Sequence, residues 1–272
     1  MPRILQISDP HLSPRSPLFR ENVAIIRRLA ETDPPDLVIA SGDLSLNGAD
    51  REEDLAFAAE MIAAFPAPVL ALPGNHDTGT DPRLSKRQPV DDARLDRWRR
   101  HCGPGFGLVD LTGWRVVGLN SEVMGTSHPE EAAQAAFIAE AAAGAGALHI
   151  ALFLHRPPFL ADPAETGFDP WCVAPEGRAA LAPLLEHPGL RLVASGHIHL
   201  HHRFARGAVR HVWAPPLSFS VAPADQPGLP GERRCGALLH RLGTDGVETE
   251  FLTHDEIVTF SLDDIREHTY PG

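Results

Sequence analysis

The chain has 272 residues, of which 43% are hydrophobic and 22% are charged. Both shares are close to the averages of globular proteins, which excludes a disordered chain, a collagen-like repeat and a coiled coil. The formal net charge is −12, so long-range attraction to a nucleic acid polymer or to an anionic membrane is not expected.

The first part of the chain alternates between strand patterns and helix patterns. Short apolar runs predict strands at 4–8, 37–40 and 69–72, and amphipathic stretches between them predict helices over 18–31 and 52–65. This β-α-β-α-β order favours a largely parallel sheet with right-handed crossovers. Ligands of such sheets bind at the carboxyl ends of the strands.

The middle of the chain predicts a helix over 91–100, two strands at 108–111 and 114–119 that turn at Thr112-Gly113, and an Ala-rich helix over 129–143. A strand at 150–154 and a helix over 176–186 follow.

The last third is dominated by strand patterns with no helices between most of them. We expect these strands to form a second sheet, mixed or antiparallel. They lie at 192–194, 203–204, 209–213, 236–240 and 247–251.

No repeat and no linker composition divides the sequence, so residues 1–272 are predicted to form a single domain. Residues from about 218 to 272 are expected to complete the second sheet or to make a subunit contact. The Pro/Gly-rich stretch 223–234 is predicted to be a surface loop near the rim of the active site or at a subunit contact.

Five short clusters of polar residues each follow one of the apolar runs. Asp, Asn and His are ligands of first-row divalent metals, and the ends of neighbouring strands bring distant residues to one edge of a sheet. The glycines among them suit turns in which the backbone approaches a bound group without a Cβ. The clusters are Asp9-x-His11, Gly42-Asp43, Gly74-Asn75-His76-Asp77, His155 and Gly196-His197-Ile198-His199.

In this order the five clusters resemble the calcineurin-like metallophosphoesterase superfamily. The opening run Ile4-Leu5-Gln6-Ile7-Ser8-Asp9-Pro10-His11-Leu12 is similar to its class III cyclic-nucleotide phosphodiesterase branch, which also includes bacterial glycerophosphodiesterases. The motifs span residues 9 to 199. The resemblance implies an α/β fold, a four-layer α/β/β/α sandwich of two mixed sheets flanked by helices, with two metal ions between the strand ends.

The resemblance also implies which residues hold the metals. Asp43 would bridge the two ions at the ~3.5–4 Å separation that suits in-line displacement at phosphorus. Mixed nitrogen and oxygen ligands suit Mn, Fe, Zn or Co, so the identity of the two divalent ions stays open. One ion would be held by Asp9, His11, Asp43 and His199, and the other by Asp43, Asn75, His155 and His197.

Four further residues have candidate roles beside the metals. His76 resembles the family histidine that contacts a substrate oxygen and helps to stabilise or protonate the leaving group, and Asp77 is expected to orient it. The sequence leaves two interpretations open for Arg156, a contact with the substrate phosphate or an outward structural side chain. It leaves two for His201 as well, a substrate contact or a solvent-facing strand residue, because strand alternation directs only one of His201 and His202 toward the site.

The activity implied by the resemblance is dinuclear metal-dependent phosphohydrolysis, in which a metal-bound hydroxide attacks the phosphorus of a cyclic nucleotide or glycerophosphodiester. A phosphomonoesterase or nucleotidase with the same centre is the first alternative. A non-catalytic scaffold is the second, and it is disfavoured because all seven ligand positions and His76 match. The expected partner is a small-molecule phosphate ester, and self-association is compatible with the sequence.

The remaining features concern the cellular compartment. Three widely spaced cysteines, Cys102, Cys172 and Cys235, form no C-x-x-C pair, as is typical of a reducing compartment. The first residues lack the pattern of a cleavable signal, and no apolar run approaches the ~18 residues of a membrane-spanning helix. We therefore expect a cytoplasmic protein.

Overall fold

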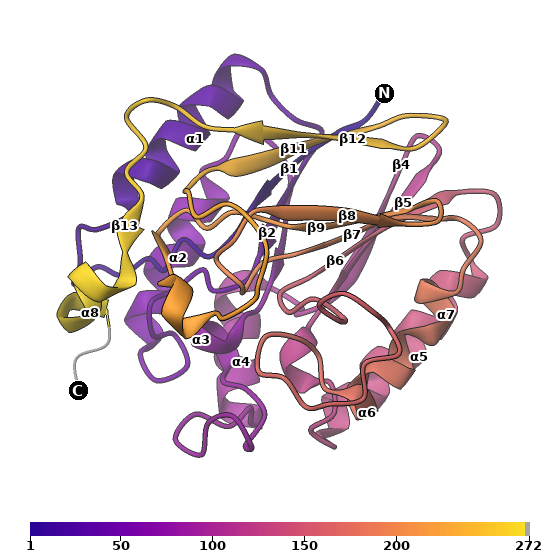
Figure 1. Ribbon diagram of the computed structural model, residues 1–272, viewed down its shortest axis with the longest axis horizontal. Coiled ribbons are helices and arrows are strands. Elements are labelled where there is room, and N and C mark those ends of the chain that lie inside the picture. The colour runs from indigo at the N-terminus through magenta and orange to yellow at the C-terminus, as the bar shows by residue number, and fades with distance from the viewer. Residues whose placement is uncertain (270–272) are drawn as a thin grey trace.

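The computed structural model describes residues 1–269, except for the side chain of residue 268. Two large mixed sheets pack face to face (Figure 1). The first has the spatial order β12 (Val247–Leu252), β11 (Ala237–Leu242), β1 (Arg3–Ile7), β2 (Leu37–Ser41) and β3 (Val69–Leu72). The second has the order β4 (Gly107–Leu111), β5 (Trp114–Leu119), β6 (His149–Leu154), β7 (Leu190–Ser195), β9 (Val209–Trp213) and β8 (His202–Arg206).

Helices cover the outer face of each sheet. α1 (Arg20–Thr32), α2 (Glu52–Ala63) and α4 (Asp92–Cys102) bury their apolar faces against the first sheet, and α5 (Pro129–Ala143) and α7 (Ala182–Leu185) bury theirs against the second. A third apolar core lies between the two sheets. The predicted four-layer α/β/β/α sandwich is therefore confirmed.

Strand β1 shows how the sequence produces these layers. Successive side chains of a strand point to opposite faces, and here both faces are buried. Leu5 and Ile7 pack against the helices, whereas Ile4 packs into the core between the sheets. A strand that is buried on both faces needs apolar residues on both, and the one buried polar residue of β1, Gln6, forms hydrogen bonds with Ser41 and His240.

One predicted helix, over 176–186, is wrong as a continuous element. The segment forms three short pieces, α6 (Pro175–Arg178), the 3₁₀ turn η2 (Ala179–Leu181) and α7. Pro183 lies in the first turn of α7, where it has no N–H to donate to the preceding turn. The helix therefore ends before this proline and a new one begins at Ala182, and Leu184 still reaches the core.

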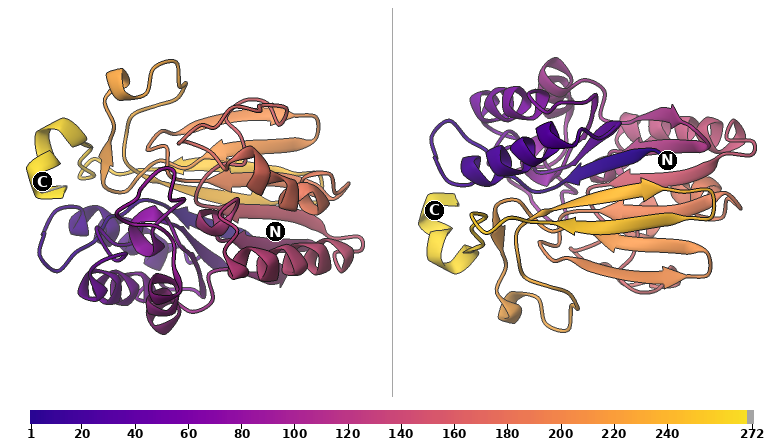
Figure 2. Two further views of the ribbon diagram at one scale, coloured as in Figure 1. Left: turned by 90° about the horizontal axis from the view of Figure 1, so that it is seen from below. Right: turned by 90° about the horizontal axis from the view of Figure 1, so that it is seen from above.

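The expectation that all late strands join the second sheet is also wrong. β11 pairs antiparallel with β1, with Ile4 opposite His240 and Gln6 opposite Leu238, and β12 pairs antiparallel with β11. The right-hand view of Figure 2 shows these two yellow strands beside the indigo β1. The apolar pattern of a strand reports its buried faces and carries no information about which free sheet edge it joins, so the sequence could not decide this pairing.

Short elements complete the described chain. β10 (Phe219–Ser220) pairs in parallel with β13 (Phe260–Ser261), and α8 (Leu262–Thr269) follows it. Phe19, Phe219 and Ile265 share a small core there. Three further short elements lie in loops, namely α3 (Asn75–Thr78), η1 (Ser121–Val123) and η3 (Pro223–Asp225).

None of the helices in residues 1–269 has the length and apolar character that crossing a membrane requires.

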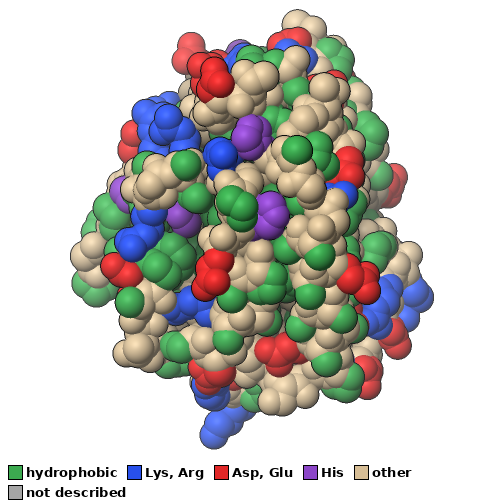
Figure 3. All heavy atoms as spheres, turned by 90° about the vertical axis from the view of Figure 1, so that its right-hand side faces the viewer, with side chains coloured by type: hydrophobic (Ala, Val, Ile, Leu, Met, Phe, Trp, Pro, Cys, Tyr) green, Lys and Arg blue, Asp and Glu red, His purple; other side chains and the backbone are tan. Residues whose placement is uncertain are grey.

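One end of the sheets faces the viewer in Figure 3, where acidic, basic and apolar side chains are interspersed. A groove at this end is lined by turn residues such as Thr112 and Asp245 and by strand residues such as His149 and Arg210. No predicted site residue lines this groove.

Candidate metal centre

The seven predicted ligand residues all follow the carboxyl ends of strands. Asp9 and His11 follow β1, Asp43 follows β2, and Asn75 begins α3 just after β3. In the second sheet His155 directly follows β6, and His197 and His199 follow β7. The structure brings the side chains of six of them into adjoining clusters, in each of which the candidate ligand atoms lie within 4.8 Å of one another. The seventh, Asn75, has its Oδ1 3.4 Å from His155 Nε2.

The backbone at these residues is unusual. Seven non-glycine residues in the described chain have positive φ, a region that side chains with a Cβ rarely adopt and that tends to occur at functional sites. Five of the seven are predicted ligands, namely Asp9, His11, Asp43, His197 and His199, with φ between 45° and 69°.

The glycines of the motifs make room for the ligand side chains themselves. A Cβ added to Gly196 would lie 1.9 Å from Ser8 Oγ and 2.6 Å from Asp9 Oδ2, and one added to Gly74 would lie 2.2 Å from Asp43 Oδ1. Gly42 has φ +97°, and a Cβ there would lie 2.2 Å from His155 Nδ1. These positions therefore exclude larger residues because ligand side chains pass directly over them.

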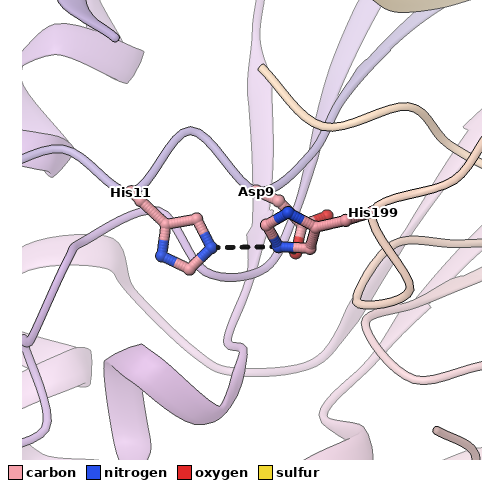
Figure 4. Close-up of side chains that lie close together, drawn as sticks. All are labelled: Asp9, His11 and His199. Atoms are coloured by element: carbon pink, nitrogen blue, oxygen red, sulfur yellow. Dashed lines mark hydrogen bonds and ion pairs between the residues drawn. The ribbon is translucent and has the colours of Figure 1, made fainter. Parts of the chain in front are cut away.

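The first cluster contains Asp9, His11 and His199 (Figure 4). His11 Nε2 and His199 Nε2 lie 3.2 Å apart, and His199 Nε2 lies 3.4 Å from Asp9 Oδ1. His199 Nδ1 donates a hydrogen bond to the Phe219 carbonyl oxygen at 2.6 Å. The neutral ring therefore presents the lone pair of Nε2 to the cluster, in the arrangement that metal-binding histidines commonly have.

The second cluster contains Asp43, His155 and His197, with Asn75 beside them. His155 Nδ1 donates to the Ser41 carbonyl oxygen at 2.9 Å, so the Nε2 lone pair of the neutral ring faces the cluster. His155 Nε2 lies 3.4 Å from Asp43 Oδ2 and 3.4 Å from Asn75 Oδ1. Three acceptor atoms thus converge, and only a proton or a metal cation between them makes the arrangement favourable.

Asp43 lies between the two clusters. Its Oδ2 is 3.4 Å from His155 Nε2 and 3.7 Å from His11 Nε2. Its other oxygen, Oδ1, accepts a hydrogen bond from the His76 backbone N–H at 2.8 Å. One carboxylate is therefore placed next to both sets of imidazoles.

The protonation equilibria report the same preference for a cation. Burial alone would lower the pKa of His155, yet the Asp43 carboxylate raises it to about 10. Burial likewise opposes ionisation of Asp43, but the charge of His155 holds the pKa of Asp43 well below its usual range. For His11 and His197, burial holds the pKa well below the usual value, which favours the neutral form that binds metals. The residues therefore fit divalent metal ions.

His76 lies at the same place as these ligands. Its ring packs edge-on against His11 with 4.6 Å between centroids, and it forms a third cluster with His11 and Asp43. His76 Nδ1 donates a hydrogen bond to the Leu46 carbonyl oxygen at 2.8 Å, which fixes the orientation of the ring beside the ligands.

Asp77 is fully buried and joins two loops. Its carboxylate accepts hydrogen bonds from Leu44 N, Ser45 N, Ser45 Oγ and Gly74 N at 2.6–3.1 Å. These bonds fix the turn that carries His76 against the loop that follows Asp43. The orienting role predicted for Asp77 can thus act through the backbone of the turn.

Arg156 is buried and only 5% exposed, so the interpretation as an outward side chain is wrong. Its guanidinium lies beside Asn75 and His197 and forms an ion pair with Glu122. Glu122 and Thr80, which both bond to Arg156, are not among the residues that the sequence predicts for the site. No motif signals either residue, because their relation to the site depends on loops that meet only in the folded chain.

His201 lies outside the three clusters. It is buried, its Nδ1 bonds to the Trp213 carbonyl oxygen at 3.1 Å, and its ring packs against Phe251. His202 is half-buried and stacks against Phe204. Neither interpretation of His201, as a substrate contact or as a solvent-facing strand residue, matches this position between two sheets.

The predicted loop 223–234 lies against the segment that carries His199. Gln226 Nε2 donates to the Ile198 carbonyl oxygen at 2.6 Å, and the backbones of His201 and Glu232 pair in both directions. The loop is therefore on the metal side of the sheets, as the first of its two interpretations expects.

Comparison with known proteins agrees with this geometry. The model of the calcineurin-like phosphoesterase family matches residues 2–201. The 3′,5′-cyclic adenosine monophosphate phosphodiesterase CpdA of Pseudomonas aeruginosa is 27% identical over 281 residues, which cover 96% of this chain and 92% of that protein. A probable glycerophosphodiester phosphodiesterase, GpdQ of Arcobacter nitrofigilis, is 26% identical over 208 residues, which cover 72% and 71%.

Solved structures share the fold at lower sequence identity. A dimetal phosphatase from Danio rerio superposes with a TM-score of 0.58 at 15% identity, and the match covers 92% of this chain and 96% of that one. The four-layer arrangement of strands and helices is thus found in an enzyme that is described as a dimetal phosphatase.

Proposed function

The chain belongs to the calcineurin-like phosphoesterase family, and from this premise we propose that it hydrolyses phosphodiesters with a dinuclear metal centre. Its substrate is a small phosphodiester, either a cyclic nucleotide or a glycerophosphodiester. One ion is held by Asp9, His11, Asp43 and His199, and the other by Asp43, Asn75, His155 and His197.

The position of Asp43 is the observation that carries this proposal. Oδ2 lies within 3.7 Å of imidazole nitrogens from both clusters, and His155 and His199 each donate their Nδ1–H to a backbone carbonyl. That second bond orients each ring and directs Nε2 inward. A carboxylate that faces one imidazole of each cluster, His11 and His155, is suited to bridge two cations.

Two bound divalent ions supply a nucleophile from water at neutral pH and neutralise the charge that develops on the phosphoryl oxygens. Asp9 and Asp43 offset only two of the four positive charges that the ions bring. The centre is therefore locally positive within a chain of net charge −12, and it can bind an anionic substrate without help from the rest of the surface.

His76 is suited to act on the leaving group. Its Nδ1 is committed to the Leu46 carbonyl and its backbone N–H to Asp43, so the ring is fixed next to the cluster. In the protonated ring, Nε2–H donates to the oxygen that departs from phosphorus. An alkoxide is a poor leaving group, and proton donation by a positioned acid typically contributes ~10²–10⁴-fold.

The relatives favour a diester over a monoester. The one that covers 96% of this chain is described as a cyclic AMP phosphodiesterase, and another as a probable glycerophosphodiester phosphodiesterase. A phosphomonoesterase or nucleotidase with the same centre stays the alternative, since the same ligands serve both reactions. A non-catalytic scaffold is disfavoured because the ligands and His76 are all present in one cluster region.

Turnover of matched chromogenic esters tests this function. The protein is stripped of metal, reconstituted with Mn²⁺, and assayed with bis(p-nitrophenyl) phosphate and with p-nitrophenyl phosphate. We expect kcat/KM to be at least tenfold higher for the diester, and cyclic AMP or a glycerophosphodiester to be hydrolysed in the follow-up panel. A higher kcat/KM for the monoester would identify a phosphomonoesterase, and no turnover by protein with two bound ions would identify a scaffold.

The cellular setting stays a prediction. The three cysteines are free, which agrees with a reducing compartment such as the cytoplasm. Self-association is a prediction that sedimentation or light scattering would test.

A further inference from the structure

Arg156 and Glu122 form a buried ion pair next to the second cluster. Arg156 Nε lies 3.0 Å from each oxygen of the Glu122 carboxylate, and the Glu122 side chain has no exposed surface. The backbone around the pair is also fixed, because Arg156 N donates to Ser121 Oγ at 2.9 Å and Glu122 N donates to Asn120 Oδ1 at 2.9 Å. The pair is therefore a built part of the interior.

The other guanidinium nitrogens point toward the proposed second metal position. Nη2 lies 3.1 Å from Thr80 Oγ1 and 3.4 Å from Asn75 Oδ1. Nη1 contacts the Pro170 carbonyl oxygen and lies 2.8 Å from His197 Nε2. Asn75 and His197 are both proposed ligands of the second ion.

The first metal position has no such support from this pair. In residues 1–269, no hydrogen bond or ion pair of Arg156 or Glu122 involves Asp9, His11 or His199. The planar guanidinium can hold two groups at a fixed spacing, which the flexible ammonium of a lysine cannot do.

The charges of the pair matter as well as its shape. A buried guanidinium beside a divalent cation would oppose metal binding if it were unpaired, and Glu122 supplies the compensating negative charge. Removal of either partner alone leaves an unpaired buried charge, which is costly. Arg156 and Glu122 are therefore each stabilised in the interior by the charge of the other.

We propose that Arg156 and Glu122 are a positioning pair that holds Asn75 and His197 in place for the second metal ion. The pair sets the affinity of the second metal position and leaves that of the first unchanged. This inference rests on the dinuclear centre proposed above.

Arg156 also fastens the loop that contains Pro170, and a control separates this effect from the positioning of ligands. Arg178 is a second buried arginine that holds the same loop. It donates to the carbonyl oxygens of Pro163, Glu165 and Val173 at 2.8–3.3 Å. No bond joins Arg178 to a proposed ligand in the described residues, so Arg178→Met loosens the loop without touching Asn75 or His197.

The test is a titration of metal-free protein with Mn²⁺ by isothermal calorimetry, with bound ions counted after dialysis. Circular dichroism and thermal melting verify that each variant is folded. Loss of groups that orient metal ligands typically lowers affinity by ~10–100-fold. The variants are Arg156→Met, Arg156→Lys, Glu122→Gln and Arg178→Met.

We expect two ions in the wild type. In Arg156→Met and Glu122→Gln the second ion should bind at least tenfold more weakly, while the first binds within threefold of wild type. Arg156→Lys keeps the positive charge but loses the planar guanidinium, and it should also weaken binding at the second metal position. Arg178→Met should change the affinity of neither metal position. If Arg156→Met fails to fold, Arg156→Lys and Glu122→Gln carry the same expectation.

Two results would overturn the inference while leaving the dinuclear centre intact. One is a folded Arg156 variant that binds both ions as the wild type does. The other is an equal loss in Arg156→Lys and Arg178→Met, which would assign the effect to the loop. A wild type that binds a single ion would instead refute the proposed centre itself.

Discussion

His11 and His199 are separated by 188 positions in the chain, and their Nε2 atoms lie 3.2 Å apart. His199 donates its Nδ1–H to the Phe219 carbonyl, so its inward nitrogen carries a lone pair when the ring is neutral. Two sheets that meet at their strand ends hold the rings in this position. A divalent cation held by both nitrogens and by Asp9 would take the place of the hydrogen bond that the metal-free rings form when His11 carries its proton on Nε2.

Replacement of Asp43 should disrupt both metal positions. We expect Asp43→Ala to bind well below two ions per chain and to lose turnover, because Oδ2 faces both clusters. Metal analysis after dialysis measures the stoichiometry. His101→Ala is the matched control, since His101 pairs with Glu52 on the surface and should retain two ions. Two tightly bound ions in Asp43→Ala would refute the bridging role.

Replacement of His76 should affect the chemistry more than the metals. His76→Ala should keep both ions and the fold, and kcat should fall by ~10²–10⁴-fold for diesters with alkyl leaving groups. The loss should be much smaller for p-nitrophenyl esters, whose leaving group needs little protonation. Steady-state kinetics with both substrate types measure the difference. An equal loss for both would assign His76 to phosphate positioning, and loss of an ion would make it a metal ligand.

A methyl group at Gly196 should damage the first metal position. The added Cβ would lie 1.9 Å from Ser8 Oγ and 2.6 Å from Asp9 Oδ2, so Asp9 must move. We expect Gly196→Ala to lose about 1–3 kcal/mol of unfolding free energy and to bind the first ion more weakly. Gly167→Ala is the control, because no atom lies within 4 Å of its added Cβ, and it should stay within about 0.5 kcal/mol of wild type. Normal Mn²⁺ binding by Gly196→Ala would contradict the packing argument.

His240 should contribute to acid denaturation. It is fully buried between Gln6 and Thr249, and burial lowers its pKa to about 3. Above the unfolded-state pKa of about 6.5, His240 is neutral in both the folded and the unfolded protein. As the pH falls below that value, only the unfolded protein binds a proton at His240. The unfolding free energy therefore drops by about 1.4 kcal/mol per pH unit until about pH 3.

The variant His240→Gln removes this proton uptake. Between pH 7 and pH 5 the metal-free variant should lose about 2 kcal/mol less unfolding free energy than the wild type does. Urea denaturation at the two pH values measures the loss. Equal losses in the two proteins would show that His240 is not kept neutral by the fold.

The sequence predicted an element correctly where its own residues determine the structure. The strands before Asp9, Asp43 and Asn75 were predicted to within one residue, because each is an apolar run that ends at a turn. The candidate metal-ligand clusters were predicted because the motifs follow strands and resemble those of a known family.

The failures concern relations between distant segments. The placement of β11 beside β1 depends on which sheet edge is free, and the apolar pattern of 237–242 is the same in either case. The partnership of Glu122 with Arg156 spans 34 positions and two loops, so no spacing rule signals it. In the predicted helix over 176–186 the signal was present, since Pro183 interrupts it.

A crystal structure of the Mn²⁺-loaded protein with anomalous scattering data would show whether Asp43 bridges two metal ions. We expect two anomalous peaks about 3.5–4 Å apart, both in contact with the Asp43 carboxylate, with His11 and His199 on one ion and His155 and His197 on the other. A single peak, or a second peak that does not contact Asp43, would contradict it.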